Sequence, residues 1–350
     1  MYSNKLYEQT PTRFWVNNPT PNEARQALAL GNTVSVASNG NYVKRMLSMD
    51  ETKDATIAEI DRCILAGMAD DDAIVGMAAL YNLRQIAEIY RPLFEESNGE
   101  LGWVAIQGNP HRDTDYTYMK AEAERFYAAA PNIRVKFPAT IEALSALRHF
   151  TGEGKATLAT CGFSIPYAKA AAKAYHEAAT SCGKAVPKLF ITTLAGPFDE
   201  YIGKYVKANH IEISDEVLAQ AGCEMAKELY ATQQREFPEV NCSLLGGCRF
   251  PYHFTEMVPA NMNVTVNFDF IEKLNALDPP VESRIDVRAD RAAIDELCQK
   301  IPSFRYAFCG EGAYLHWSMQ PAAQYFRNYV GNGWNVALGT VRERRILLKK

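Results

Sequence analysis

The sequence predicts an α/β protein built as one (β/α)8 TIM barrel with extra C-terminal helices. The chain has 350 residues, 47% of them hydrophobic, which suits a single large α/β core. Eight short β-rich runs alternate with longer segments of helical period, and several runs are apolar on both faces, as covered parallel strands are. A doubly wound open sheet would give a similar alternation and stays open as the alternative. We expect 1–350 to form a single domain, with 290–350 as a helical tail that packs on the barrel.

The eight predicted strands are Arg13–Asn17, Thr33–Ser38, Gly102–Gln107, Ile133–Phe137, Ala156–Thr160, Lys188–Leu194, Ser243–Cys248 and Val264–Phe268. The segments between them are predicted as helices because apolar side chains recur three or four residues apart, as at Ile57, Ile60 and Ile64. A second helix of this kind is expected to run to about Tyr90, where Pro92 would stop it.

Several helix starts are marked by side chains that can accept hydrogen bonds from the first backbone N–H groups. Thr140, Ser214 and Asp290 are predicted N-caps of this kind, and Ser164 is a predicted N-cap followed by Pro166 in the first turn. The tail contains a group of aromatic residues, namely Tyr306, Phe308, Tyr314, Trp317, Tyr325 and Phe326. We expect this tail to cross one face of the barrel and to close either the active site or a subunit contact, the latter implying a homodimer.

Composition and motif searches exclude several classes of protein. A formal charge of -4, with no dense run of Lys or Arg, argues against a nucleic-acid partner. No apolar stretch is long enough for a membrane span or typical of a signal peptide, so a soluble, cytoplasmic protein is expected. The eight cysteines, Cys242 among them, lack C-x-x-C spacing, and the six histidines lack metal-ligand spacing. No nucleotide, dinucleotide or zinc motif is present, so neither a metal nor a cofactor is expected.

A lysine within a predicted apolar strand is the strongest chemical signal. Lys136 lies in Ile133–Phe137, and Pro138 and the predicted cap Thr140 follow. A lysine whose stem is buried in a barrel has a lowered pKa, because desolvation disfavours the charged form, and a neutral amine can attack a carbonyl carbon. The alternative is a strand-end lysine that extends into solvent or pairs with a carboxylate.

Five segments in order resemble the transaldolase family. They are VSVASNGNYV, VKFPAT around Lys136, ATLATCGFS, LLGGCRF and MNVTVNFDFIEKL, and the similarity covers about Arg13 to Leu274. The resemblance implies that Lys136 forms a Schiff base with a ketose or sugar phosphate, and that the protein is an aldolase or an aldol transferase. The expected partner is therefore a small-molecule sugar.

The resemblance also implies roles for other residues at the carboxyl ends of the strands. Thr160 would hold the water that carries protons. Asn39 would bind substrate hydroxyls, Thr192 would contact substrate, and Arg249 would bind the distal end of the substrate, a phosphate in most family members.

Four positions depart from the family pattern. Asn17 replaces the family's general acid/base Asp, and Gln107 replaces the Glu that partners the catalytic water. A Gln at the position of Gln107 resembles the fructose 6-phosphate aldolase branch of the family, but Leu194 stands where that branch has its acid/base Tyr. Pro197 stands where the family has a second phosphate-binding Arg. Amides orient a ligand without exchanging protons. Other proton carriers are therefore expected among Asp199, Tyr252, His253, Glu256 and Glu311.

Two other functions remain open. The replacements at Asn17 and Gln107 allow a barrel that binds a sugar or sugar phosphate without turning it over. The aromatic tail allows a protein whose functional element is the tail, with the barrel serving as a scaffold.

Overall fold

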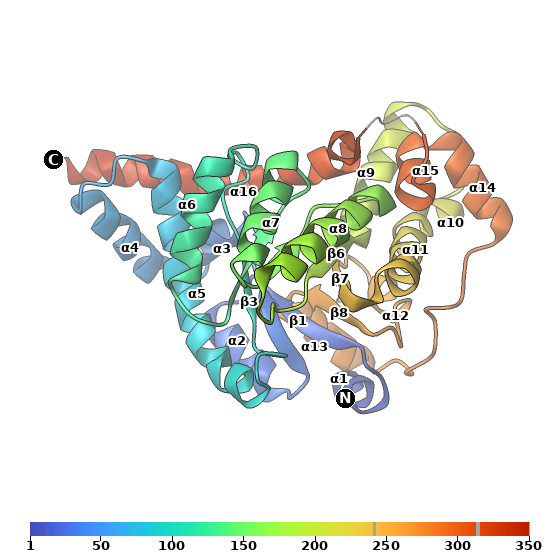
Figure 1. The fold of residues 1–350 in the computed structure, drawn as a ribbon, viewed down its shortest axis with the longest axis horizontal. Helices are drawn as coiled ribbons and strands as arrows, with labels where there is room; N and C mark the ends of the chain where they lie inside the picture. Colours follow the sequence, from blue (N-terminus) through green and yellow to red (C-terminus); the bar gives the residue numbers. More distant parts are fainter. Residues whose placement is uncertain (241–242, 313–315, 350) are drawn as a thin grey trace.

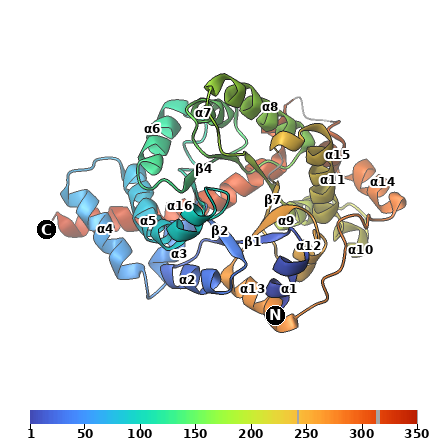
Figure 2. The same ribbon diagram turned by 60° about the horizontal axis from the view of Figure 1, so that its bottom comes forward.

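A computed structural model describes residues 1–240, 243–312 and 316–349, so that Cys242 and Tyr314 lie outside the described residues. Eight parallel strands form a closed barrel in which each strand pairs with the next and β8 pairs with β1 (Figures 1 and 2). The strands are β1 (Arg13–Asn17), β2 (Thr33–Ala37), β3 (Val104–Gln107), β4 (Ile133–Phe137), β5 (Thr157–Ala159), β6 (Phe190–Leu194), β7 (Ser243–Gly246) and β8 (Met262–Val266). The pairing of β8 with β1 excludes the open sheet and confirms the predicted barrel.

The predicted boundaries of the eighth strand were wrong. This strand begins at Met262, which is buried and pairs with Ser243, and it ends at Val266. Asn267 then takes an extended conformation at the N-cap position, so that Phe268 opens a helix rather than ending the strand.

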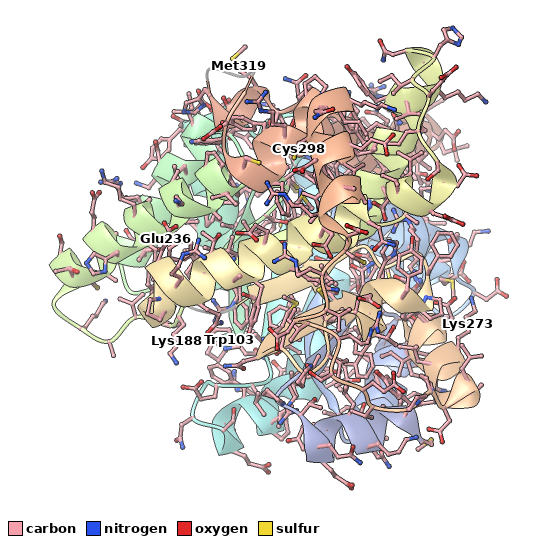
Figure 3. The ribbon with its side chains drawn as sticks, turned by 90° about the vertical axis from the view of Figure 1, so that its right-hand side faces the viewer. Trp103, Lys188, Glu236, Lys273, Cys298 and Met319 are labelled. Atoms are coloured by element: carbon pink, nitrogen blue, oxygen red, sulfur yellow. The ribbon has the colours of Figure 1, made fainter. Side chains whose placement is uncertain are left out.

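Helices cover the outside of the barrel and its carboxyl end. They are α1 (Tyr2–Gln9), α2 (Pro21–Ala29), α3 (Tyr42–Ser48), α4 (Lys53–Leu65), α5 (Asp71–Glu96), α6 (Tyr116–Tyr127), α7 (Ile141–Gly152), α8 (Ile165–Cys182), α9 (Ala195–Ala208), α10 (Asp215–Leu218), α11 (Ala221–Glu236), α12 (Pro251–Thr255), α13 (Phe268–Leu277), α14 (Arg291–Lys300), α15 (Pro302–Cys309) and α16 (Pro321–Leu348). The outer helices also contact one another, and the 2.7 Å ion pair between Lys169 and Glu236 joins α8 to α11 (Figure 3). Within the described ranges, no helix has the length and apolar character needed to cross a membrane.

The four predicted N-caps are confirmed, because the side chains of Thr140, Ser164, Ser214 and Asp290 each accept a backbone N–H of the following turn. The predicted stop at Pro92 was wrong, since α5 continues to Glu96. Pro92 lies on the exposed face of the helix, where water can satisfy the carbonyl that loses its N–H partner. Packing of the opposite, buried face holds the helix together through this position.

The barrel interior changes from apolar to polar along its axis. Side chains such as Trp15, Leu158 and Phe190 fill the amino half. Arg134 closes that end by donating to the carbonyls of Thr157 and Lys188, each at 2.8 Å. Because alternate residues of a strand point to the same face, the residue two positions after Arg134, which is Lys136, points into the carboxyl half.

The C-terminal helix α16 extends over the barrel end and onto the helices α3, α4 and α5 (Figure 1). Arg344 pairs with Asp61 on α4, and Arg345 pairs with Asp71 on α5. Nearer the barrel, Arg327 forms a two-pronged ion pair with Asp113 in the loop between β3 and α6. The Arg327 pair holds the amino half of α16 at the open end of the barrel, and the other two pairs hold its carboxyl half on α4 and α5.

Candidate active site

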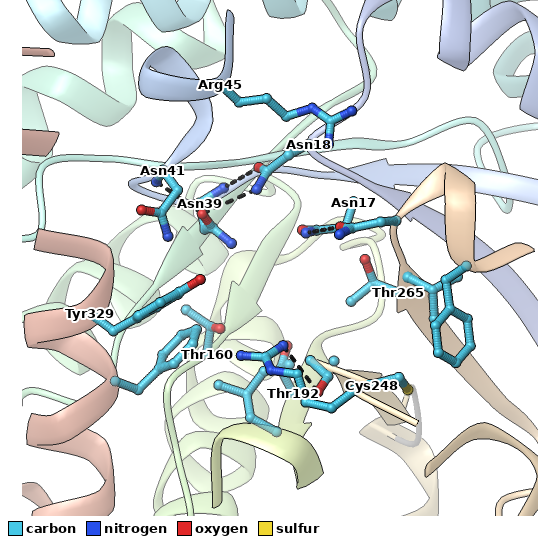
Figure 4. A pocket seen from close by; sticks show the side chains of 18 of the residues that line it. Asn17, Asn18, Asn39, Asn41, Arg45, Thr160, Thr192, Cys248, Thr265 and Tyr329 are labelled. Carbon is cyan, nitrogen blue, oxygen red and sulfur yellow. Dashed lines mark hydrogen bonds between the residues drawn. The ribbon is translucent and has the colours of Figure 1, made fainter. Parts of the chain in front are cut away.

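A cavity of about 500 Å³ lies at the carboxyl ends of the strands (Figure 4). It is lined by six of the seven residues that the resemblance assigns to the site, namely Asn17, Asn39, Lys136, Thr160, Thr192 and Arg249. Gln107 is the exception. It borders a separate space of about 20 Å³ that Lys136 also borders.

Lys136 is held in the barrel interior with only 8% of its surface exposed. Its amine donates a 2.9 Å hydrogen bond to the carbonyl oxygen of Ser38 and makes no ion pair with the residues that the structure describes. Burial lowers the pKa of Lys136 from 10.5 to about 8 because desolvation disfavours the charged form. The amine therefore neither extends into bulk solvent nor pairs with a carboxylate, in contrast to the alternative considered above.

Beside the lysine lies a cysteine that sequence reasoning missed. Cys161 follows β5 and has a φ of +57°, a left-handed conformation that a β-rich pattern does not signal. Its sulfur lies 3.9 Å from Nε2 of Gln107 and 3.9 Å from Oγ1 of Thr160. Burial raises the pKa of this thiol to about 11, so Cys161 is a neutral neighbour of the amine at physiological pH.

Asparagine side chains form one wall of the cavity, at the ends of β1, β2 and β8 (Figure 4). Asn17 donates a 2.9 Å hydrogen bond to Oδ1 of Asn267. Asn18, with a φ of +48°, accepts from the backbone N–H of Asn39 at 3.0 Å and donates to its Oδ1 at 3.3 Å. Asn18 and Asn267 were not foreseen as site residues. Together these amides present a neutral surface of donors and acceptors suited to hydroxyl groups.

Arg249 is positioned by a buried histidine. The ring nitrogen Nδ1 of His253 accepts the backbone N–H of Arg249 at 3.0 Å, so Nε2 carries the proton and donates to Asp199 at 2.8 Å. Burial raises the pKa of Asp199, and its bond to His253 opposes that rise. The Arg249 guanidinium donates to Glu200 at 2.6 Å, so its charge is already partly compensated.

The residues proposed from the sequence as proton carriers do not line the cavity; they are Asp199, Tyr252, His253, Glu256 and Glu311. Asp199 and His253 bind each other, as described above. Glu256 pairs with the buried Lys227 at 2.6 Å and with Arg284 at 2.8 Å. Short-range sequence patterns could not reveal these partners, because each is distant along the chain.

Replacing His253 by Ala should lower the free energy of unfolding by about 2 kcal/mol. It leaves the backbone N–H of Arg249 without its acceptor, and among the residues that the structure describes the half-buried carboxylate of Asp199 keeps only the backbone N–H of Gly222 as a donor. Urea unfolding measures this loss. His253→Asn is the matched control, since the Asn oxygen can replace Nδ1 as an acceptor and should retain part of the stability. Equal stability of the Ala variant and the parent would contradict the proposed role of the ring.

A polar cavity at the carboxyl ends of a closed parallel barrel, with a buried amine in it, has the arrangement of (β/α)8 enzymes, whose active sites occupy this end. The transaldolase/fructose-6-phosphate aldolase family model matches residues 14–305. The chain belongs to this family, as its resemblance predicted.

Curated relatives agree with this assignment at low identity. The transaldolase of Mycobacterium tuberculosis strain H37Rv is 27% identical over 217 residues, which are 59% of this chain and 56% of that protein. The transaldolase of Thermobifida fusca is 28% identical over 152 residues, 43% of this chain and 40% of that protein. The transaldolase of Mycolicibacterium smegmatis is 28% identical over 211 residues, which are 58% of this chain and 56% of that protein. The chain spans about half the length of the relatives it matches.

Proposed function

We propose that this protein is a transaldolase-like aldolase or aldol transferase in which Lys136 forms an imine with a ketose or sugar phosphate. The observation that carries the proposal is a buried amine, with a pKa lowered to about 8, that borders a polar cavity of about 500 Å³. At pH 7 this pKa leaves roughly one amine in ten uncharged, about 300-fold more than for an ordinary lysine. The uncharged form is the nucleophile.

The proposed reaction follows from the chemistry of an imine. The amine adds to the carbonyl carbon, and water leaves as the imine forms. The cationic imine then accepts the electron pair of the bond between the α and β carbons, which leaves an enamine on Lys136, while the hydroxyl on the β carbon loses its proton and becomes an aldehyde carbonyl. The enamine is protonated and the resulting imine hydrolysed by water in an aldolase, or the enamine attacks an acceptor aldehyde in a transferase, and hydrolysis then frees the amine. Thr160 borders the cavity with Lys136 and can hold a water for this proton. Asn17 and Gln107 can orient groups but cannot carry the proton.

The cavity walls are suited to a polyhydroxylated ligand. Asn17, Asn39 and Thr192 offer amide and hydroxyl groups to sugar hydroxyls. Arg249 can bind a phosphate at the end of the substrate far from Lys136, but that phosphate must share the guanidinium with the carboxylate of Glu200. We therefore expect phosphate to strengthen binding less than it would at an unpaired arginine.

The proposal is tested by reducing the enzyme with borohydride in the presence of ketoses and locating the label by peptide mass spectrometry. Label on Lys136 is expected, with a rate that rises with pH and is half-maximal near pH 8, because the neutral amine becomes the major form there. An exposed lysine would give a midpoint near 10.5. The proposal fails if no carbonyl compound places label on Lys136.

A sugar-binding barrel without turnover is the second candidate. It is favoured by the amides at Asn17 and Gln107, which cannot carry a proton. It is also favoured by the scarcity of carboxylates in the cavity: among the described lining residues Asp269 is the only one, and it pairs with Lys273 at 3.2 Å. This function predicts that a sugar raises the melting temperature while no product forms. Product formation with any ketose rejects it.

A further inference from the structure

Helix α16 contributes to the wall of the cavity through Phe326 and Tyr329. The helix and the loop after β2 approach at the level of their backbones. A Cβ on Gly40 would lie 2.9 Å from the carbonyl oxygen of Val330, and a Cβ on Gly333 would collide with Oδ1 of Asn41. Two glycines, one on each segment, therefore permit a contact that larger residues would prevent.

This contact sets the orientation of the Asn41 side chain. Its oxygen packs against Gly333, so the amide nitrogen is directed away from the helix and toward the cavity (Figure 4). The backbone N–H of Asn41 donates to Oδ1 of Asn39 at 3.0 Å, which holds the loop in place. Asn41 therefore presents N–H donors to a ligand.

Tyr329 faces Asn41 from the helix side. Figure 4 shows its ring at the edge of the cavity with the hydroxyl pointing inward and no hydrogen bond to the residues drawn. The ring stacks on Phe326 with centroids 5.9 Å apart, which limits its rotation. Tyr329 is 46% exposed and Lys136 is 8% exposed, so Tyr329 lies at the mouth of the cavity and the Lys136 amine lies deep inside it.

We propose that the Tyr329 hydroxyl and the Asn41 amide nitrogen form a subsite that binds hydroxyl groups of the sugar chain distal to the carbonyl held at Lys136. The subsite makes the enzyme sensitive to sugar length. A three-carbon ketone occupies the deep end alone, whereas a six-carbon ketose extends to the mouth. This inference rests on the proposed function, because Lys136 fixes the carbonyl end of the ligand.

The test measures the ketone concentration that gives half-maximal borohydride labelling of Lys136, and compares it between the parent and each variant. Two ketones are used, dihydroxyacetone and unphosphorylated fructose. Tyr329→Phe keeps the ring and removes the hydroxyl, and should raise this concentration about 5- to 10-fold for fructose, as loss of one hydrogen bond does. Asn41→Ala should act in the same direction. Dihydroxyacetone should show no change with either variant.

Tyr325→Phe is the matched control. Tyr325 lies on the same helix outside the cavity lining, and its hydroxyl accepts from Lys204 at 2.7 Å. This variant should label like the parent with both ketones. Melting temperatures of all three variants show whether the fold is retained.

Two results would overturn the subsite. The first is equal labelling of Tyr329→Phe and the parent by fructose. The second is an equal loss with dihydroxyacetone, which would indicate displacement of the helix rather than loss of a distal contact. If the parent labels with neither ketone, the proposed function fails. The subsite is then judged by a fructose titration followed through the ligand's NMR signals, in which unchanged affinity of Tyr329→Phe rejects it.

Discussion

Replacing Lys136 by Met should abolish imine labelling and turnover while making the protein more stable at neutral pH. The first effect follows because the proposed nucleophile is removed, and we expect activity to fall at least about 1000-fold. The second effect, on stability, follows from the lowered pKa of the buried amine, from 10.5 to about 8. At neutral pH this amine is mostly charged, and the charge costs free energy in the folded protein relative to the unfolded one. That cost is about 3 kcal/mol, at about 1.4 kcal/mol for each factor of ten.

The hydrogen bond from the amine to Ser38 offsets part of this cost, by about 1 kcal/mol. The expected gain for Lys136→Met is therefore about 2 kcal/mol at pH 7. Below pH 8 both the folded and the unfolded parent are protonated, so the gain is complete. As pH rises from 8 to 10.5 the folded amine is already neutral while the unfolded amine still binds its proton, so the parent gains about 3 kcal/mol of stability and becomes the more stable protein by about 1 kcal/mol.

Urea unfolding at pH 7 and at pH 10.5 measures this difference. Lys173→Met is a suitable control, because the Lys173 side chain is 76% exposed and should show neither the gain nor its pH dependence. A Lys136→Met variant that is less stable than the parent at pH 7 would contradict the assignment of a desolvated amine. Labelling of a different lysine in this variant would contradict its role as the nucleophile.

Replacing Arg327 by Met should destabilise the protein by about 3 kcal/mol. The Asp113 side chain is only 4% exposed, so removing Arg327 leaves a buried carboxylate without its counter-charge. Burial raises the pKa of Asp113, and Arg327 opposes that rise; without the arginine, the carboxyl should take up a proton at higher pH. The loss should therefore be smaller in acid.

Urea unfolding of four proteins tests this prediction: the parent, Arg327→Met, Asp113→Asn and the double variant. The double variant should recover much of the loss, because no uncompensated charge remains. Arg112 and Asp115 form an ion pair in the same loop with side chains 44% and 38% exposed, and Arg112→Met should change stability little. Purely additive losses in the double variant would show that the two groups do not stabilise each other.

Local patterns were sufficient to predict most of the strands and caps, because strand periodicity and N-cap chemistry depend on neighbouring residues. Closure of the barrel could not be deduced in the same way. It depends on pairing between Arg13 and Asn263, which are distant along the chain, and an open sheet has the same order of elements. The alternation of strands and helices favoured the barrel but left the open sheet as an alternative, and only the pairing of β8 with β1 decides between them.

The same limit applies to the candidate site. Residues at strand ends, such as Asn17 and Lys136, could be anticipated, because the carboxyl ends of parallel strands meet at one end of a barrel. Cys161 and Asn18 reach the site through left-handed backbone conformations, which are uncommon for residues other than glycine, although Asn adopts them more readily than most. Tyr329 reaches it through long-range packing of α16, which no local pattern indicates.

The position of α16 has a consequence for how the protein is made. All eight strands have been synthesised once Val266 is added, but the cavity wall also needs Tyr329, and the ion pairs that anchor the helix need Arg344 and Arg345. About 80 further residues must be translated, which takes roughly 4 to 16 s at 5–20 residues per second. During that interval the eight strands lack the part of the cavity wall that α16 supplies through Phe326 and Tyr329, so this wall is the last part of the cavity to be completed.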